Sequence, residues 1–123
     1  MSTQAYVLRP DSLRADERQV TLVVGLPWYR ALPWAGVADV RVTLDGRPVE
    51  VVSVDGRDLG ALQDDPGYWG IQRRAEVVLD ASALRGASVA VGVHVDLLIP
   101  GPTKPDGSPM DFAFETERRL TAA

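Results

Sequence analysis

His94 is the only histidine of the 123-residue chain, so any histidine-based chemistry must use it. Asp96 follows two positions later, on the same face of the strand that we expect here. A carboxylate beside an imidazole can orient a general base, and a small independent enzyme is therefore one hypothesis. An ordinary polar pair on a solvent or interface face is the commoner explanation, because no further partner is defined. We expect no catalytic residue in this chain.

Two acidic pairs, Asp16-Glu17 and Asp64-Asp65, raise the question of metal binding or acid–base chemistry. Both lie in polar, loop-like sequence, where solvated charge is the usual explanation, and glycosidase chemistry needs carboxylates fixed by surrounding structure. The chain has no cysteine, which excludes disulfides, thiolate nucleophiles and zinc–thiolate sites. No serine lies in a nucleophile elbow, and no glycine-rich loop has phosphate-binding spacing. We expect neither a metal nor a cofactor in this chain.

The most distinctive residues are aromatic and lie close to prolines, which restrict their backbones. The segments GLPWYRALPW and PGYWG contain Trp28, Tyr29, Arg30, Trp34, Tyr68 and Trp69. These residue types carry much of the energy of protein interfaces and line sugar-binding platforms. They also plug the open end of small β-sandwiches. We expect a divided role, with one tryptophan of the first segment in the core and Tyr29 and Arg30 facing a partner.

The elements that position these residues are strands, because the dominant sequence pattern has period two. In residues 89–97 the odd positions are large and aliphatic and the even positions are small or polar, as in a strand with one buried face. Residues 40–44 alternate in the same way and end at Asp45-Gly46, a dipeptide suited to a two-residue hairpin turn. Residues 48–54 form the returning arm, which a second Asp-Gly pair closes.

Further strands are predicted at residues 20–26, 75–80 and 110–117, the last with Met110, Phe112 and Phe114 on one face. Helix signals are weak: residues 58–64 could form one turn, and residues 82–86 a tight connection ending in glycine. Two long loops are predicted, at residues 58–74 and 99–109.

Short strands separated by Gly, Pro and Asp predict an all-β, antiparallel β-sandwich of the jelly-roll kind, with few or no helices. A small barrel is the alternative. At this length we expect a single domain over residues 1–123.

The composition limits the classes of partner. The net charge is −4 and the basic residues are scattered, so we expect no nucleic-acid role. The first 18 residues lack the apolar core of a signal peptide, and no run approaches membrane-spanning length. We therefore expect a cytoplasmic protein without membrane contact.

Several motifs occur in a characteristic order: LPWYRALPW at 26–34, DVRVTLDGRPV at 39–49, VDGRDL at 54–59, the aromatic pair at 68–69, the alternating strand at 87–98 and RRLT at 118–121. In this order the chain resembles the small β subunits of bacterial C-glycoside deglycosidases, over most of its length. None of these motifs is catalytic. Trp28 and Trp34 stand where the family pattern has tyrosine and a smaller residue, a difference that bears on local packing.

The resemblance implies a specific function. In such systems a separate oxidoreductase first oxidises the sugar 3-hydroxyl of a C-glycoside. The deglycosidase then removes the C2 proton and expels the aglycone by β-elimination. A large, TIM-barrel-like α subunit carries the acid–base residues and a divalent metal, usually manganese. The β subunit is a sandwich that binds the α subunit and helps to shape or stabilise the site.

By this resemblance the chain is a non-catalytic subunit of a hetero-oligomer. The six aromatic-segment residues named above would then contact the α subunit or the wall of its 3-oxo-C-glycoside pocket. The alternative is a stand-alone carbohydrate-binding sandwich whose aromatic rings stack on sugars. Such modules are usually tethered to a catalytic domain or secreted, and the chain shows neither a linker nor a signal.

Overall fold

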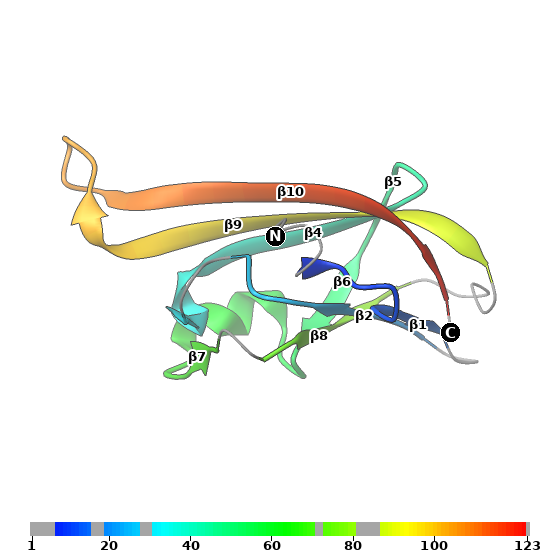
Figure 1. Ribbon diagram of the computed structural model, residues 1–123. Helices are drawn as coiled ribbons and strands as arrows, with labels where there is room; N and C mark the ends of the chain where they lie inside the picture. The colour runs from blue at the N-terminus through cyan, green and yellow to red at the C-terminus, as the bar shows by residue number, and fades with distance from the viewer. Residues whose placement is uncertain (1–6, 16–18, 28–30, 71–72, 81–86, 123) are drawn as a thin grey trace.

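Two four-stranded antiparallel sheets face each other in the computed structural model, which describes residues 7–15, 19–27, 31–70, 73–80 and 87–122 (Figure 1). The first sheet, in spatial order, consists of β1 (Leu13–Ala15), β2 (Val20–Val24), β8 (Ala75–Leu79) and β6 (Val51–Val54). The second consists of β10 (Pro109–Thr121), β9 (Ser88–Thr103), β4 (Val37–Leu44) and β5 (Arg47–Val49). A two-stranded piece pairs β3 (Leu32–Pro33) with β7 (Tyr68–Trp69), and two short 3-10 helices are η1 (Trp34–Gly36) and η2 (Leu59–Asp64).

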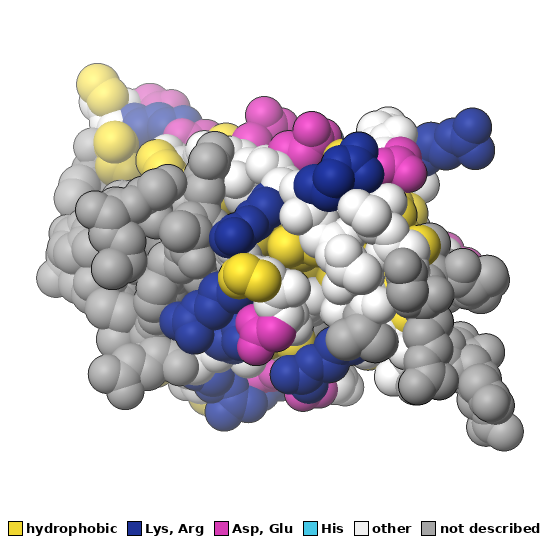
Figure 2. All heavy atoms as spheres, turned by 45° about the vertical axis from the view of Figure 1, so that its right-hand side comes forward, with side chains coloured by type: hydrophobic (Ala, Val, Ile, Leu, Met, Phe, Trp, Pro, Cys, Tyr) yellow, Lys and Arg dark blue, Asp and Glu magenta, His cyan; other side chains and the backbone are white. Residues whose placement is uncertain are grey.

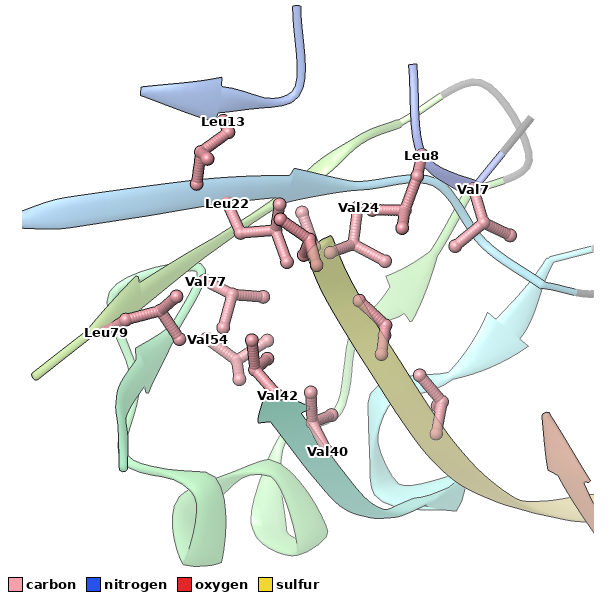
Figure 3. Packing of buried hydrophobic residues seen from close by; sticks show 14 of the residues in the cluster. Val7, Leu8, Leu13, Leu22, Val24, Val40, Val42, Val54, Val77 and Leu79 are labelled. Carbon is pink, nitrogen blue, oxygen red and sulfur yellow. The ribbon is translucent and has the colours of Figure 1, made fainter. Parts of the chain in front are cut away.

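The core lies between the two sheets. Leu22 and Val77 of the first sheet point toward Val40 and Val42 of the second (Figure 3). Each such aliphatic side chain is almost fully buried, which contributes roughly 1.5–3 kcal/mol of stability per residue. The alternation of apolar and polar residues therefore produces two apolar faces that cover each other, and the predicted antiparallel β-sandwich is confirmed.

The dipeptides Asp45-Gly46 and Asp55-Gly56 each form a tight turn with positive φ at both residues. Asp45 and Gly46 have φ of 52° and 80°, and Asp55 and Gly56 have φ of 53° and 82°. These angles are typical of the two-residue turn that matches the twist of paired strands.

The single strand predicted at residues 48–54 is wrong. β5 pairs with β4 in the second sheet, whereas β6 pairs with β8 in the first. The chain changes sheets at Glu50, whose carbonyl accepts a hydrogen bond from the N–H of Asp80 at 2.9 Å. Period-two alternation continues through this crossing, so the sequence pattern alone does not reveal it.

The long loop predicted at residues 99–109 is also wrong, because β9 continues to Thr103 and β10 begins at Pro109. The connection is a tight turn of residues 104–108, in which the Lys104 N–H donates to the Ser108 carbonyl at 2.8 Å and Gly107 has φ of +85°. Beyond Leu97, β9 no longer pairs with β4. Proline is tolerated in such a stretch because a strand without a neighbour on one side does not need every N–H.

The segment predicted as a loop at residues 58–74 contains structure of its own. η2 forms the turn expected at residues 58–64, and β7 follows it. The connection predicted at residues 82–86 and the acidic pair Asp16-Glu17 lie outside the described residues.

Candidate functional site

Trp34 and Trp69 form a buried stack at the end of the sandwich where β3 and β7 pair. Their ring centroids are 5.1 Å apart, the ring planes are inclined by only 6°, and each residue is 2% exposed. β3 brings the two rings together, because Leu32 pairs with Trp69 and Trp34 follows two residues later. The Trp69 indole N–H also donates to the Arg73 carbonyl at 2.9 Å. Both tryptophans are core residues within this chain.

Arg57 and Asp65 complete the surroundings of the stack. The Arg57 guanidinium lies 5.4 Å from the centroid of the Trp34 ring, a cation–π contact. Its Nε is 2.6 Å from Oδ2 of Asp65, and Oδ1 of the same carboxylate accepts the Gly67 N–H at 2.7 Å. Asp65 thus binds the turn before β7 to the cation above Trp34. We expected both carboxylates of the Asp64-Asp65 pair to be solvated. For Asp65 this is wrong, because Arg57 and the Gly67 N–H hold its carboxylate.

Tyr68 differs from the two tryptophans because 64% of its surface is exposed. Trp28, Tyr29 and Arg30 lie outside the described residues. The six residues of the predicted contact set therefore divide into a buried pair, one exposed tyrosine and a segment without a structural account. Trp34 of the first segment lies in the core. Contact of these residues with a partner or substrate stays a prediction.

His94 lies between two carboxylates on the outer face of the second sheet. Its Nδ1 is 2.8 Å from Oε1 of Glu115, the residue opposite it on β10, and its Nε2 is 2.7 Å from Oδ1 of Asp96. Partial burial disfavours the charged imidazole, but the hydrogen bonds to Glu115 and Asp96 outweigh it, so the pKa of His94 is raised. The pair predicted from the sequence therefore shares a face, with Glu115 as a third member.

This arrangement argues against His94 as a general base. In the protonated ring both nitrogens donate to carboxylates, and neither has a lone pair available to accept a proton. Asp96 also lies 4.0 Å from Nη2 of Arg41, whose Nε is 3.3 Å from Asp39. The result is a chain of alternating charges across three strands, which couples β4, β9 and β10.

A groove of about 790 Å³ lies beside this cluster. Its walls come from β4, β5, β9 and β10, from the crossing between the sheets and from η2; they include Arg41, Thr43, Pro48, Glu50, Leu59, Gly92, His94, Glu115 and Glu117. The cationic groups among them, Arg41 and His94, already face carboxylates. In the described ranges no group of three or more His, Cys, Asp or Glu side chains could hold a metal ion.

Large apolar side chains are exposed at the far end of the β9–β10 hairpin. Leu98, Met110 and Phe112 are 38%, 39% and 38% exposed. Figure 2 shows hydrophobic side chains at this end of the molecule, beside acidic and basic ones. The sequence pattern placed Met110 and Phe112 on one face but did not indicate that the face extends past the opposite sheet. Within the described residues, no helix is long and apolar enough to cross a membrane.

Comparison with known proteins identifies the family. No family model matches the sequence. The 3'-dehydrocarminate deglycosidase beta subunit of Microbacterium sp is 31% identical over 126 residues, which cover 93% of this chain and 91% of the relative. The C-glycoside deglycosidase beta subunit of Microbacterium trichothecenolyticum is 35% identical in an alignment 109 residues long, which spans 80% of this chain and 83% of the relative. The resemblance seen in the order of sequence motifs is therefore confirmed, and the chain belongs to the family of C-glycoside deglycosidase β subunits.

Proposed function

We propose that the chain is the non-catalytic β subunit of a heteromeric C-glycoside deglycosidase that cleaves the C–C glycosidic bond of 3-oxo-C-glycosides. The proposal rests on the similarity to two deglycosidase β subunits over 80–93% of the chain. One relative is named for 3'-dehydrocarminate, a compound oxidised at a 3' position, which supports a 3-oxo glycoside as the substrate class.

The proposed reaction is a β-elimination. A carbonyl at sugar C3 acidifies the C2–H bond, because the carbanion left at C2 is delocalised as an enolate. A base removes the C2 proton, the enolate re-forms the ketone with a C1=C2 double bond, and the bond from C1 to the aglycone breaks. Its electron pair goes to the aglycone carbon, which takes up a proton. One proton leaves C2 and one is delivered to the aglycone, so a base and an acid are required.

We place the base, the acid and a divalent metal, expected to be Mn²⁺, in a TIM-barrel-like α subunit. The described part of the chain supports this division of labour, since its histidine is held between two carboxylates and its carboxylate clusters do not fit a metal. The role of the chain is then to bind the α subunit and to support the pocket of the complex. A cytoplasmic location is part of the proposal.

Co-expression with the α subunit tests the function. The two chains should copurify, and the complex should release the aglycone from a 3-oxo-C-glycoside faster than the α subunit alone. If the chains do not copurify and the α subunit is equally active without this one, the proposed function is wrong. Titration calorimetry of this chain alone with glycosides tests the carbohydrate-binding alternative, because only a binding module should release heat without a partner.

A further inference from the structure

The end of the β9–β10 hairpin, residues 98–111, projects beyond the sandwich and is called the hairpin arm below. Figure 1 shows it reaching past the first sheet. Among the described residues, β9 beyond Leu97 pairs only with β10. A two-stranded ribbon is marginally stable by itself. Here it is closed by the ion pair of Lys104 with Asp111 at 3.0 Å and by Asp106, which accepts hydrogen bonds from Ser108. These contacts stabilise the projecting arm.

The arm exposes apolar side chains on both of its faces. Met110 pairs with Ile99 and shares the inner face with Leu97, whereas Leu98 alternates to the outer face. Leu98 and Met110 are each exposed by more than a third. The strand β7, whose Tyr68 is exposed, lies at the same end of the molecule (Figure 1). A groove in a partner would cover both Leu98 and Met110, whereas a flat surface would cover only one of them.

Carboxylates border the outer apolar residue of the arm. Asp111 is directly opposite Leu98 across the strands, and Asp96 is the next outward residue along β9. The hydrogen bond and charge of Lys104 lower the pKa of Asp111, so this carboxylate is ionised at neutral pH. Although Asp111 pairs with Lys104, residues 98–111 contain two aspartates and one lysine and are net negative, so two copies of the arm packed against each other would repel. A groove with an apolar floor and a basic rim complements the arm.

We propose that the hairpin arm is the part of this chain that enters a groove on the α subunit of the deglycosidase, one with an apolar floor and a basic rim. The inference rests on the proposed function, which requires an α subunit. Leu98 and Met110 are the anchors, since a few buried side chains dominate most interfaces. Tyr68 extends the contact toward β7.

The test uses the full-length chain and the α subunit, with the double substitution Leu98→Ser and Met110→Ser. Both side chains lie outside the core, so the thermal unfolding midpoint should match that of the wild type. The Kd for the α subunit should rise at least about tenfold. The matched control is Val52→Ser, because Val52 is 48% exposed on β6 of the other sheet and should leave the Kd unchanged.

The outcomes separate this inference from the proposed function. If the wild-type chain does not bind the α subunit, the proposed function fails. If the wild type binds and the double variant binds equally well, the function stands and the docking arm is overturned. Loss of self-association with α binding intact would assign the arm to a second copy, which also overturns it. Should the double variant unfold at lower temperature, Asp111→Lys is compared with Lys104→Ala, because both break the Lys104–Asp111 ion pair but only the first adds positive charge. At low ionic strength Asp111→Lys should bind more weakly than Lys104→Ala, and equal binding contradicts the proposal.

Discussion

Trp34 and Trp69 stack almost in parallel, with 5.1 Å between their ring centroids. They come from two segments that are far apart in sequence and are joined by the short β3–β7 pairing. β7, which carries Trp69, lies at the end of the sandwich from which the hairpin arm projects (Figure 1). The buried stack therefore fixes the backbone that carries the exposed Tyr68.

Trp69→Ala should lower the free energy of unfolding by about 3–5 kcal/mol, because it removes a fully buried indole and leaves a cavity against Trp34. The loss is measured by urea denaturation. Tyr68→Ala is the matched control, since the neighbouring ring is exposed and its loss should change stability by no more than about 0.5 kcal/mol. Equal effects of the two substitutions would contradict a structural role for the stack.

Gly36→Ala should destabilise the chain by about 1–3 kcal/mol. A Cβ at Gly36 would lie 2.8 Å from the carbonyl oxygen of Leu98, so η1 could no longer pack closely against β9. Gly60→Ala in η2 is the control, because a Cβ there meets nothing within 4 Å. Thermal unfolding of the two variants checks the difference. If Gly36→Ala left the thermal unfolding midpoint unchanged, η1 would be free to shift away from β9.

Asp65→Ala should lower stability by about 1–3 kcal/mol, because it removes the ion pair with Arg57 and the bond to the Gly67 N–H. Asp64→Ala removes an equal charge from an exposed site one residue away and should be nearly neutral. Chemical denaturation of both variants compares them at equal net charge. If Asp64→Ala proves the more damaging, the proposed role of Asp65 in the turn is wrong.

His94 should make stability depend on pH. Its pKa is raised in the folded state above the ordinary value of 6.5, so protonation stabilises the fold. The contribution is fully present below pH 6.5 and is lost as the pH rises through the folded-state pKa. The stability difference between wild type and His94→Gln should therefore shrink as the pH rises above 6.5 and passes through the raised pKa of His94. Denaturation at several pH values measures it.

A direct check uses NMR titration of the imidazole protons, which need no assignment because His94 is the only histidine. Glu115→Gln should lower the pKa of His94, since it replaces a charged hydrogen-bond acceptor with a neutral one. An unchanged pKa in this variant would show that the Glu115 contact does not persist in solution.

The strands were predictable from sequence because each buries one face. Residues 89–97 alternate strictly, and their buried positions are the aliphatic ones. The division of residues 48–54 between two sheets was not predictable, because alternation reports which side of a strand is apolar and not which neighbour it pairs with. The prolines of residues 99–109 indicated a loop, although a ribbon with one free edge accepts them.

The aromatic segments show the same limit at the level of single residues. Tyr68 and Trp69 are adjacent and similar in type, yet the first is exposed and the second buried, because a strand alternates its sides. The sequence indicated that both residues are important, but it did not indicate which of the two side chains points into the core. Met110 was placed on the correct face, but its exposure depends on the length of the opposite sheet, which no local pattern encodes.

The order of strands in the two sheets has a consequence for how the chain folds. In one sheet Leu22 pairs with Val77, and in the other Val42 pairs with Val93, so the central pairs join distant parts of the sequence. Such long loops must close before either sheet exists, and proteins of this kind fold in milliseconds to seconds. During synthesis, β2 and β4 lack these central partners until β8 and β9 have left the ribosome. Until then their unpaired edges are exposed to aggregation.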